Sequence, residues 1–188
     1  EYKLNYYISG GTYLGAVRHH GFIPWDDDVD VAMPRRDYNK FIKIAPKVMD
    51  KKFKLKHYSL QKGIIHFFAK IEDSRYQLID NTASIPRKVD LWIDIFPLDG
   101  LPENPVVRKI HKFRLLALRG LFKLSLFDQI VMQSNHDRPW YENAVIAVAK
   151  NVDFSKVLSP YKRMRALDKA LSKYDFYKST YIMNFLGS

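Results

Sequence analysis

The sequence contains no cysteine and no long apolar run. Without thiols the chain can form neither a disulfide nor a thiolate zinc site, it has no thiol nucleophile, and its composition suits a reducing compartment. Its longest apolar run, Ala144–Ala149, is far shorter than the about 18 residues that indicate a membrane span. Internal repeats and low-complexity segments are also lacking. These absences exclude disulfide scaffolds and repeat proteins and leave an ordinary globular protein.

Acidic residues are scarce, with 20 Asp and Glu against 31 Lys and Arg, which gives a formal net charge of +11. Such an excess favours anionic partners, namely nucleotides, phosphorylated substrates, nucleic acid or an acidic membrane surface. Nucleic-acid binding needs basic residues interleaved with exposed aromatic ones along a groove. No such tract stands out, so we expect no nucleic-acid partner.

The length of 188 residues and the apolar content of 47% suit one domain with a sizeable core. We expect a single domain over 1–188, sheet-rich over 1–103 and mainly helical over 104–188. The first residue is Glu rather than Met, and the last, 184–188, look like a broken-off strand. We therefore expect a fragment of a longer chain.

Strand patterns dominate the first half of the sequence and helical patterns the second. The expected strands are 4–9, 29–33, 53–59, 64–71, 76–80 and 89–96, the last ended by Pro97 and an Asp99-Gly100 turn. The expected helices are 12–18, 36–49, 106–130, 142–150 and 161–174, with a loop at 136–140. Pro46 should kink or end the second of these helices. This order predicts an α+β fold in which a mixed sheet, flanked by helices, carries the site.

The few acids are concentrated in one place, because four of the residues 26–30 are aspartates. On a strand, Asp28 and Asp30 project to one side while Val29 and Val31 enter the core. Adjacent carboxylates repel each other unless cations or protons neutralise them. Divalent cations with a preference for oxygen ligands make such a pair favourable. The pattern therefore predicts a metal site, and the alternative is a solvated edge strand.

A third acid, Asp94, lies between Ile93 and Ile95 on a later strand. Three acids on adjacent strands can hold two magnesium ions that clamp the oxygens of an in-line phosphoryl displacement. Asp90 and Asp99 compete for this third position, and a lysine or arginine partner for Asp94 is the structural alternative.

Gly10, Gly11 and Thr12 precede the acids, between an expected strand and an expected helix. Backbone N–H groups at a helix start bind phosphate, and glycine lets the phosphate approach the backbone closely. Alone, this triplet is a weak signal, because tight turns produce it often. Followed by alternating aspartates and apolar residues, it is a stronger one.

The whole stretch S-G-G-T-Y-L-G-A-V-R-H-H-G-F-I-P-W-D-D-D-V-D-V (9–31), with I-D-I-F-P-L-D-G-L-P (93–102), resembles the LicD family. That family is similar to the catalytic domain of fukutin-related protein and belongs to the DNA polymerase beta-like nucleotidyltransferase superfamily. The resemblance implies a nucleotidyltransferase-type sheet and transfer of phosphocholine, or a related phospho-alcohol, from a CDP-alcohol donor to a sugar hydroxyl. The acceptor would be a teichoic acid precursor, another cell-surface glycan or a lipid-linked sugar.

By the same resemblance, Asp28, Asp30 and Asp94 are the catalytic metal ligands for Mg²⁺ or Mn²⁺, and Gly10, Gly11 and Thr12 face the donor phosphates. One carboxylate, Asp94, would help to remove the proton of the attacking hydroxyl. Rival interpretations are another donor, such as CDP-ribitol, or a non-catalytic basic module that binds membrane or nucleic acid.

The residues around the acids have two interpretations each. Arg18 either neutralises donor phosphate or pairs with Asp26 or Asp27. Asp26 is assigned to the substrate site, whereas Asp27 should be solvated. Trp25 either holds a cationic choline head by cation–π contact or, as the favoured alternative, is a buried anchor of its loop. The adjacent His19 and His20 are expected at the surface.

The helix over 106–124 separates charge from apolar surface. Arg108, Lys112, Arg119 and Lys123 fall within an arc of about 60°, and the opposite side gathers Val106, Ile110, Phe113, Ala117, Leu121 and Leu124. The favoured interpretation is a helix packed on the core by its apolar side, with a solvated basic face. The alternative is a basic face that meets anionic lipid. We accordingly expect a cytoplasmic protein, with peripheral association at the inner membrane surface left open.

Overall fold

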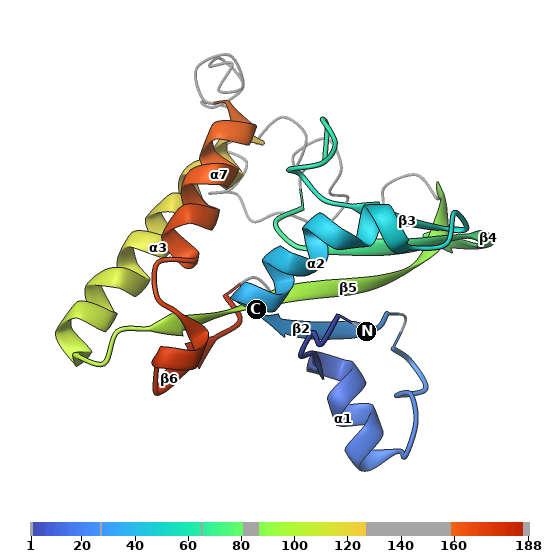
Figure 1. Cartoon of the computed structure of the whole chain (residues 1–188), viewed down its shortest axis with the longest axis horizontal. Helices are drawn as coiled ribbons and strands as arrows, with labels where there is room; N and C mark the ends of the chain where they lie inside the picture. The colour runs from blue at the N-terminus through green and yellow to red at the C-terminus, as the bar shows by residue number, and fades with distance from the viewer. Residues whose placement is uncertain (1, 27, 65, 81–86, 127–158, 186–188) are drawn as a thin grey trace, which may run out of the picture.

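The structure is a computed structural model that describes residues 2–26, 28–64, 66–80, 87–126 and 159–185 (Figure 1). In chain order the elements are β1 (Tyr7–Ile8), α1 (Gly10–Arg18), β2 (Asp30–Pro34), α2 (Arg35–Val48), β3 (Phe53–Lys56), β4 (Ala69–Asp80), β5 (Arg87–Leu101), α3 (Pro105–Ser125), α7 (Pro160–Leu171), the 3₁₀ helix η1 (Phe176–Lys178) and β6 (Tyr181–Met183). The expected loop at 136–140 and helix at 142–150 lie outside the described residues.

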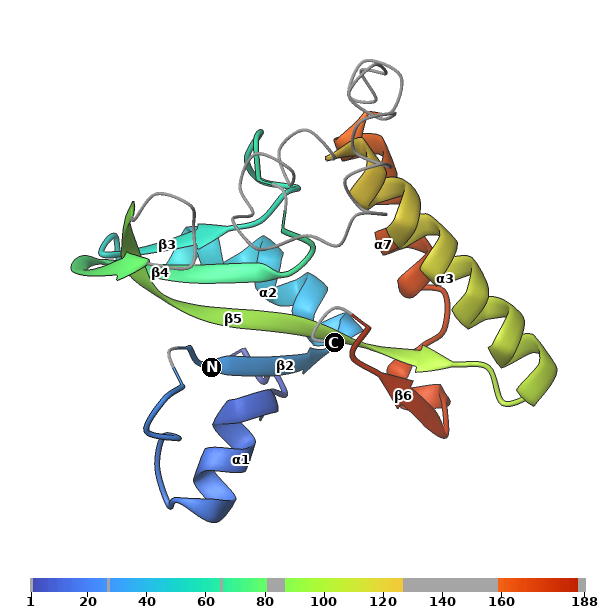
Figure 2. The same cartoon turned by 180° about the vertical axis from the view of Figure 1, so that it is seen from behind.

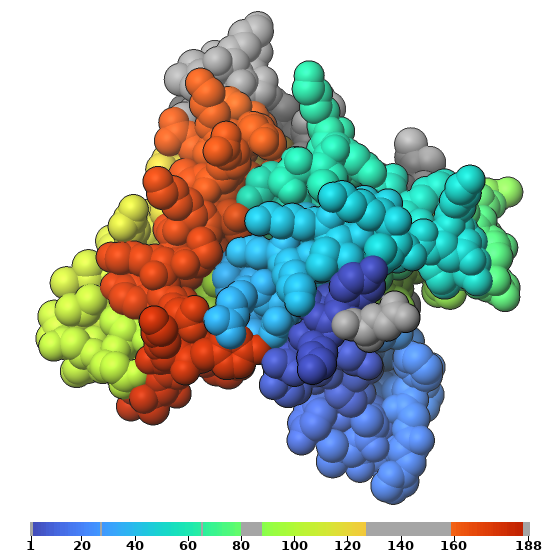
Figure 3. Space-filling view, in the orientation of Figure 1, coloured from blue at the N-terminus to red at the C-terminus, as the bar shows by residue number. Residues whose placement is uncertain are grey.

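The strands form one mixed sheet in the order β1-β2-β5-β4-β3, and β6 pairs with the far end of β5. The central pair, β2 and β5, is parallel, whereas each of the other pairs is antiparallel. Helix α2 crosses one face of the sheet (Figure 1), and α1 projects with the following segment as a lobe beside β2 (Figure 3). The predicted α+β fold with a mixed sheet flanked by helices is therefore confirmed.

The main core lies between α2 and the sheet. Tyr38 and Ile42 of α2 pack against Met33 of β2, Ala69 of β4 and Ile95 of β5, all of them buried. Because side chains alternate along a strand, Val31 and Met33 of β2 and Ile95 of β5 face this core. Their even-numbered neighbours, Asp30 and Asp94 among them, project from the opposite face.

Several strand boundaries differ from the expected ones. Of the strand expected over 4–9, only Tyr7–Ile8 pairs, with Val31 and Ala32. Of the described residues in the expected strand 64–71, only 69–71 are in a strand. They are continuous with the expected strand 76–80 in β4, whose pairing with β5 shifts register between Asp73 and Gln77. Such an irregularity bends a strand without ending it. The helix expected over 36–49 is α2, which contains Pro46 in its last turn.

The expected end of β5 is wrong, because the strand continues through Pro97 and Gly100 to Leu101. Pro97 lies opposite Met33 in the parallel pair, and Gly100 then pairs with Ile182 of β6. Asp99 is thus a strand residue and not a turn former. Tertiary pairing on both sides of the strand overrides the local turn signal of Asp99-Gly100.

Helices α3 and α7 pack together at one end of the sheet (Figure 2). Both begin with a proline after a capping residue: the Asn104 side chain accepts hydrogen bonds from the backbone N–H groups of Val106 and Val107, and that of Ser159 accepts one from Lys162. Leu115 of α3 is buried against Leu167 and Leu171 of α7. Among the described helices, none combines the length and the apolar character needed to cross a membrane.

The expected orientation of α3 is wrong. Its buried side carries His111, Leu115 and Phe122, whereas the side assigned to the core is exposed, with exposed fractions of 65% for Val106, 64% for Ile110 and 75% for Phe113. The helix has apolar residues on more than one side, and the apolar residues of α7 select which side is buried.

A buried guanidinium group joins the two halves of the chain. Arg35, at the start of α2, donates from Nε and Nη2 to the two carboxylate oxygens of Asp99 on β5, each at 2.7 Å. Its Nη1 donates to Asp168 of α7, also at 2.7 Å, and Asp168 accepts a further bond of 2.6 Å from the Tyr58 hydroxyl. Burial by itself would lower the pKa of Arg35, but the hydrogen bonds and charges of the two carboxylates raise it.

The segment after α7 returns to the sheet through Gly100. The backbone N–H of Gly100 donates to the carbonyl of Tyr174, and a Cβ at this position would clash with the backbone of Asp175. Farther along, the Tyr177 hydroxyl donates to Asp37 of α2 at 2.6 Å and accepts from the Asn5 side chain at 2.9 Å. The C-terminal segment is therefore attached to both α2 and the N-terminal segment.

We predict that Asp99→Asn lowers the free energy of unfolding by about 3 kcal/mol or more, because it removes the more deeply buried of the two carboxylates that compensate the buried guanidinium of Arg35. The side chains of Arg35 and Asp99 are only 8% and 3% exposed, so water cannot replace the lost charge. Urea unfolding measures the change. Asp50→Asn is the matched control. Asp50 forms an ion pair with Lys52, but its side chain is 59% exposed, so this substitution should change the free energy of unfolding little. Equal stability of the two variants would contradict the prediction.

Candidate functional site

Three carboxylates meet where the parallel strands β2 and β5 lie side by side. Asp30 and Asp94 are direct partners in the strand register, and Asp28 precedes β2 by two residues. One oxygen from each of the three lies within 4.8 Å of the others. The predicted proximity of these acids is observed, with Asp94 rather than Asp90 or Asp99 as the third. Their role as metal ligands stays a prediction.

The crowding of these acids shifts their proton affinities. Burial raises the pKa of Asp30 to about 6, and the charges of Asp28, Asp94 and Asp26 add to the effect. Burial likewise raises the pKa of Asp94, while the neighbouring ammonium of Lys70 opposes the shift. The crowding of these acids therefore disfavours their full ionisation, and a positive charge beside the cluster offsets this cost.

Lys70 is a cation of the site that sequence reasoning missed. It lies opposite Asp94 in the pairing of β4 with β5, its Nζ is 3.1 Å from Oδ1 of Asp94, and it also lies over the Trp92 ring. Its side chain is only 17% exposed. The sequence did contain a signal: Lys70 lies between the apolar residues Ala69 and Ile71, so its side chain should point away from the core. The sequence did not show that its strand partner is Asp94.

The acid set fits a divalent cation. Oδ1 of Asp94 is buried and accepts no well-aligned hydrogen bond from any residue that the structure describes, although Lys70 is close. A divalent cation that prefers oxygen ligands could bind to this buried oxygen and to the two neighbouring carboxylates. Asp28, Asp30 and Asp94 are the residues that could hold it.

The glycine segment lies directly against the acids. Gly10 has a positive φ of 56°, and a Cβ there would clash with Oδ2 of Asp30. The Thr12 hydroxyl accepts a 2.8 Å hydrogen bond from the backbone N–H of Asp30, and the Asp30 carbonyl accepts one from Ser9. Helix α1 starts at Gly10, two residues before the expected start. Thr12 thus positions Asp30, a role that the sequence did not reveal.

Asp26 lies beside the cluster. Its Oδ2 occupies the place that a Cβ on Gly11 would take, and its charge is one of those that raise the pKa of Asp30. The carboxylate of Asp26 therefore lies directly against Gly11. The neighbouring Asp27 is outside the described part of the chain.

Arg18 is not brought to the acids by any described contact. It is exposed at the last turn of α1, and it forms no hydrogen bond or ion pair within the described residues. The alternative pairing with Asp26 is therefore not observed. Its assignment to the substrate site stays a prediction without a contact to support it.

Trp25 is 81% exposed, so the favoured expectation of a buried anchor is wrong. Its ring makes an edge-on contact with His19 at 6.0 Å between centroids, and both histidines of the segment are exposed as predicted. The same lobe exposes Tyr13 and Phe22, at 57% and 65%. A cavity of about 400 Å³ lies here, lined by Ile8, Thr12, Ala16, His20, Gly21 and Phe22. Thr12 connects this cavity to the acid cluster.

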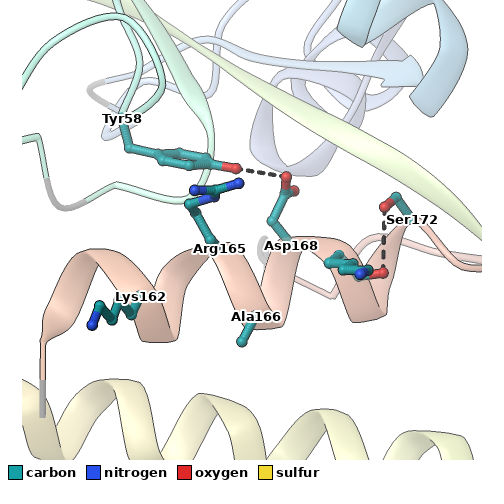
Figure 4. A pocket seen from close by; sticks show the side chains of 7 residues that line it. Tyr58, Lys162, Arg165, Ala166, Asp168 and Ser172 are labelled. Atoms are coloured by element: carbon teal, nitrogen blue, oxygen red, sulfur yellow. Dashed lines mark hydrogen bonds between the residues drawn. The ribbon is translucent and has the colours of Figure 1, made fainter.

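A second hollow, of about 600 Å³, lies on α7 and is distinct from the acids (Figure 4). Figure 4 shows the Tyr58 hydroxyl bonded to Asp168, with the Arg165 side chain pointing toward them from α7. Lys162 and Lys169 also line it. The carboxylate in this hollow already has two partners, Arg35 and Tyr58, so it belongs to the network that joins the two halves of the chain.

The pKa of Asp30 generates a prediction for the protein in EDTA. Its folded-state pKa of about 6 lies above the ordinary value of 3.8, so folding favours the protonated acid. The stabilisation is complete below the ordinary pKa and is lost as pH rises through about 6. Asp30→Asn should therefore raise the thermal midpoint by a few degrees at pH 8, and the gain should shrink toward pH 5.

Thermal unfolding over this pH range, with and without Mg²⁺, measures both effects. Mg²⁺ should stabilise the wild type at pH 8 and leave Asp30→Asn almost unchanged. Asp90→Asn, on β5 outside the cluster, is the control and should respond to Mg²⁺ as the wild type does. A lower midpoint of Asp30→Asn at pH 8 in EDTA would contradict the idea that the acids repel one another.

Comparison with known proteins gives one family match over residues 3–105, described as LicD/FKTN/FKRP, nucleotidyltransferase domain. Among curated proteins, the lipopolysaccharide cholinephosphotransferase LicD of Haemophilus influenzae is 37% identical over 127 residues, which cover 63% of this chain and 45% of that protein. The uncharacterized protein RT0683 of Rickettsia typhi is 43% identical over 55 residues, or 29% of this chain and 18% of that protein. No solved structure gives a significant match.

Proposed function

The chain belongs to the LicD/FKTN/FKRP family, and on that premise we propose that it is a metal-dependent transferase. It moves phosphocholine, or a related phospho-alcohol, from a CDP-activated donor to a sugar hydroxyl of a cell-surface glycan or of a teichoic acid precursor. The observation that carries this proposal is the meeting of Asp28, Asp30 and Asp94. The relative from Haemophilus influenzae, a lipopolysaccharide cholinephosphotransferase, supports phosphocholine as the transferred group.

Asp28, Asp30 and Asp94 would hold Mg²⁺ or Mn²⁺. When bound, the cation neutralises the phosphate oxygens of the donor and the charge that develops on the leaving group. The acids are held ready by the chain itself, since Thr12 fixes the backbone of Asp30 and the strand register fixes Asp94 beside it. Such preorganisation avoids a rearrangement at the moment of reaction.

In the transfer, the acceptor oxygen forms a bond to the donor phosphorus. The bond from that phosphorus to the bridging oxygen breaks, and CMP leaves with the bond's electron pair. Asp94 accepts the hydroxyl proton at a carboxylate oxygen. Lys70, beside Asp94, donates to a phosphate oxygen, and it therefore takes the charge-neutralising role that the sequence assigned to Arg18.

We predict that Asp28→Asn and Asp94→Asn each lower kcat by about 100-fold or more, because losing a cation ligand costs several kcal/mol of transition-state stabilisation. CMP release from a panel of CDP-alcohols in Mg²⁺, with a glycan acceptor, measures the rate. Asp90→Asn should keep nearly the wild-type rate. Full activity of the Asp94 variant, or no CMP release by the wild type from any donor, would contradict the proposal and favour a non-catalytic module.

The exposed aromatic residues near the acids support a cationic head group. Trp25 is the neighbour of Asp26, whose carboxylate lies beside the cluster, and its ring is largely accessible. A quaternary ammonium is attracted to the face of an aromatic ring, and Asp26 adds a negative charge nearby. We therefore include Trp25 and Asp26 in the substrate site, with choline as the head group that they bind.

For Trp25 we predict selective weakening of choline donors. Trp25→Ala should lower kcat/KM for CDP-choline by about threefold to fivefold, the loss that accompanies an exposed cation–π contact, and should leave an uncharged CDP-alcohol such as CDP-ribitol unaffected. Trp25→Phe keeps an aromatic face and should retain most of the activity. An equal loss for both donors would assign Trp25 to the structure of the loop, and preference of the wild type for CDP-ribitol would favour that rival donor.

A further inference from the structure

Helix α3 exposes an apolar stripe along its length. Val106, Ile110 and Phe113 are 65%, 64% and 75% exposed, and Leu121, about two turns beyond Phe113, is 38% exposed. With the exposed Ala117 they fall within an arc of about 80° and extend over about 22 Å. α3 packs against α7 on its other side and lies at the outer edge of the molecule (Figure 2). An apolar stripe of this length on a soluble surface normally marks an interaction site.

The charges of α3 are all of one sign. The helix carries six Lys and Arg residues and no Asp or Glu: Arg108, Lys109, Lys112, Arg114, Arg119 and Lys123. Four of them, Lys109, Lys112, Arg114 and Lys123, are exposed and form no ion pair within the described part of the chain. Measured from the centre of the stripe, Lys109 lies about 80° to one side and Arg114 about 60° to the other, so these two cations border it on both edges. Lys112 and Lys123 lie more than about 100° from that centre, toward the basic side of the helix.

The two remaining cations are turned toward the protein. Arg108 lies over the Tyr181 ring at 3.8 Å and donates to the carbonyl of Pro102, and Arg119 donates to the carbonyl of Phe185. These contacts connect α3 to the C-terminal segment that follows α7. They fix the rotation of the helix, so that the stripe and the four exposed cations keep facing outward.

From this arrangement we propose that α3 is a docking surface for an anionic lipid bilayer, and that it lies in the plane of the membrane interface. Its stripe enters the boundary between headgroups and acyl chains, and the flanking ammonium and guanidinium groups contact the lipid phosphates. A second copy of the chain is a poorer occupant, because it would bring six further cations against these six. The proposal does not depend on the transferase activity and differs from an attachment by the basic face alone.

Co-sedimentation of the full chain with vesicles tests the proposal. Vesicles of phosphatidylcholine with about one third phosphatidylglycerol should bind the protein at low salt, and pure phosphatidylcholine vesicles should bind it weakly. Binding should fall as salt screens the charges but should not vanish, because the apolar contribution persists. Failure of the wild type to bind the anionic vesicles would overturn the proposal.

Two double variants test whether binding depends on the apolar stripe of α3 or on exposed apolar residues in general. Ile110→Ser with Phe113→Ser should lower the vesicle-bound to free ratio by about tenfold. The control is Tyr76→Ser with Ile79→Ser on β4, two residues that are likewise exposed, at 56% and 65%, and it should bind as the wild type does. Equal binding by both pairs would overturn the role of the stripe.

The charge contribution has its own matched pair. Changing Lys109, Lys112, Arg114 and Lys123 to Gln should abolish the preference for anionic vesicles. The control changes four exposed lysines near α2 and β3, Lys43, Lys47, Lys51 and Lys54, to Gln and removes the same net charge. If the control loses as much binding as the α3 variant, the attraction is a property of net charge and the docking surface is refuted.

Insertion can be measured directly, because the chain has no cysteine of its own. A polarity-sensitive dye on Phe113→Cys should shift its emission to the blue with anionic vesicles, whereas the same dye on Ile79→Cys should not. A dye at 113 that is already blue-shifted without vesicles would show another occupant. A shift independent of dilution would assign it to a segment of the same chain, one that depends on dilution would assign it to a second copy, and either result would overturn the proposal.

Discussion

The buried guanidinium of Arg35 holds the fold together, because it joins three elements that are far apart in the sequence. It opens α2 directly after β2, it forms two bonds with Asp99 near the end of β5, and it reaches Asp168 on α7. A charge buried this deeply is stable only while its partners remain in place. The position of the α3–α7 pair against the sheet is therefore set by an electrostatic requirement as well as by apolar packing.

The same short segment connects this network to the acid cluster. β2 begins with Asp30 and ends at Pro34, directly before Arg35, and throughout it is paired in register with β5, which carries both Asp94 and Asp99. One end of the strand pair thus holds carboxylates that repel one another, and the other end holds a carboxylate that is fully compensated. The Arg35–Asp99 pair supplies stability that the acid cluster lacks. Crowding of like charges is expected of a cation site before its cation binds.

The acid cluster could be predicted from the sequence because the signals for it are local and periodic. Alternation placed Asp28 and Asp30 on one side of a strand, and the apolar neighbours of Asp94 placed it on another strand. The role of Lys70, the strand position of Asp99 and the hydrogen bond between Thr12 and Asp30 were not predicted, because they depend on partners far along the chain. Lys70 faces Asp94 only through strand pairing, and the Asp99-Gly100 dipeptide has the composition of a turn. The exposure of Trp25 depends on how the lobe around α1 packs, which no local pattern records.

Helix α3 illustrates the limit of periodicity in a second way. A helical repeat divides residues among faces, but it does not say which face a partner will cover. In α3 the line of His111, Leu115 and Phe122 is buried by α7 and its surroundings, although the opposite side is the richer in large apolar residues. Arg108 lies over the Tyr181 ring and Arg119 donates to the carbonyl of Phe185. These contacts with the C-terminal segment require this rotation, since the two cations could not reach their partners if the helix were turned over. The contacts that fix the helix thus also leave its most apolar side outside the fold, bordered by cations.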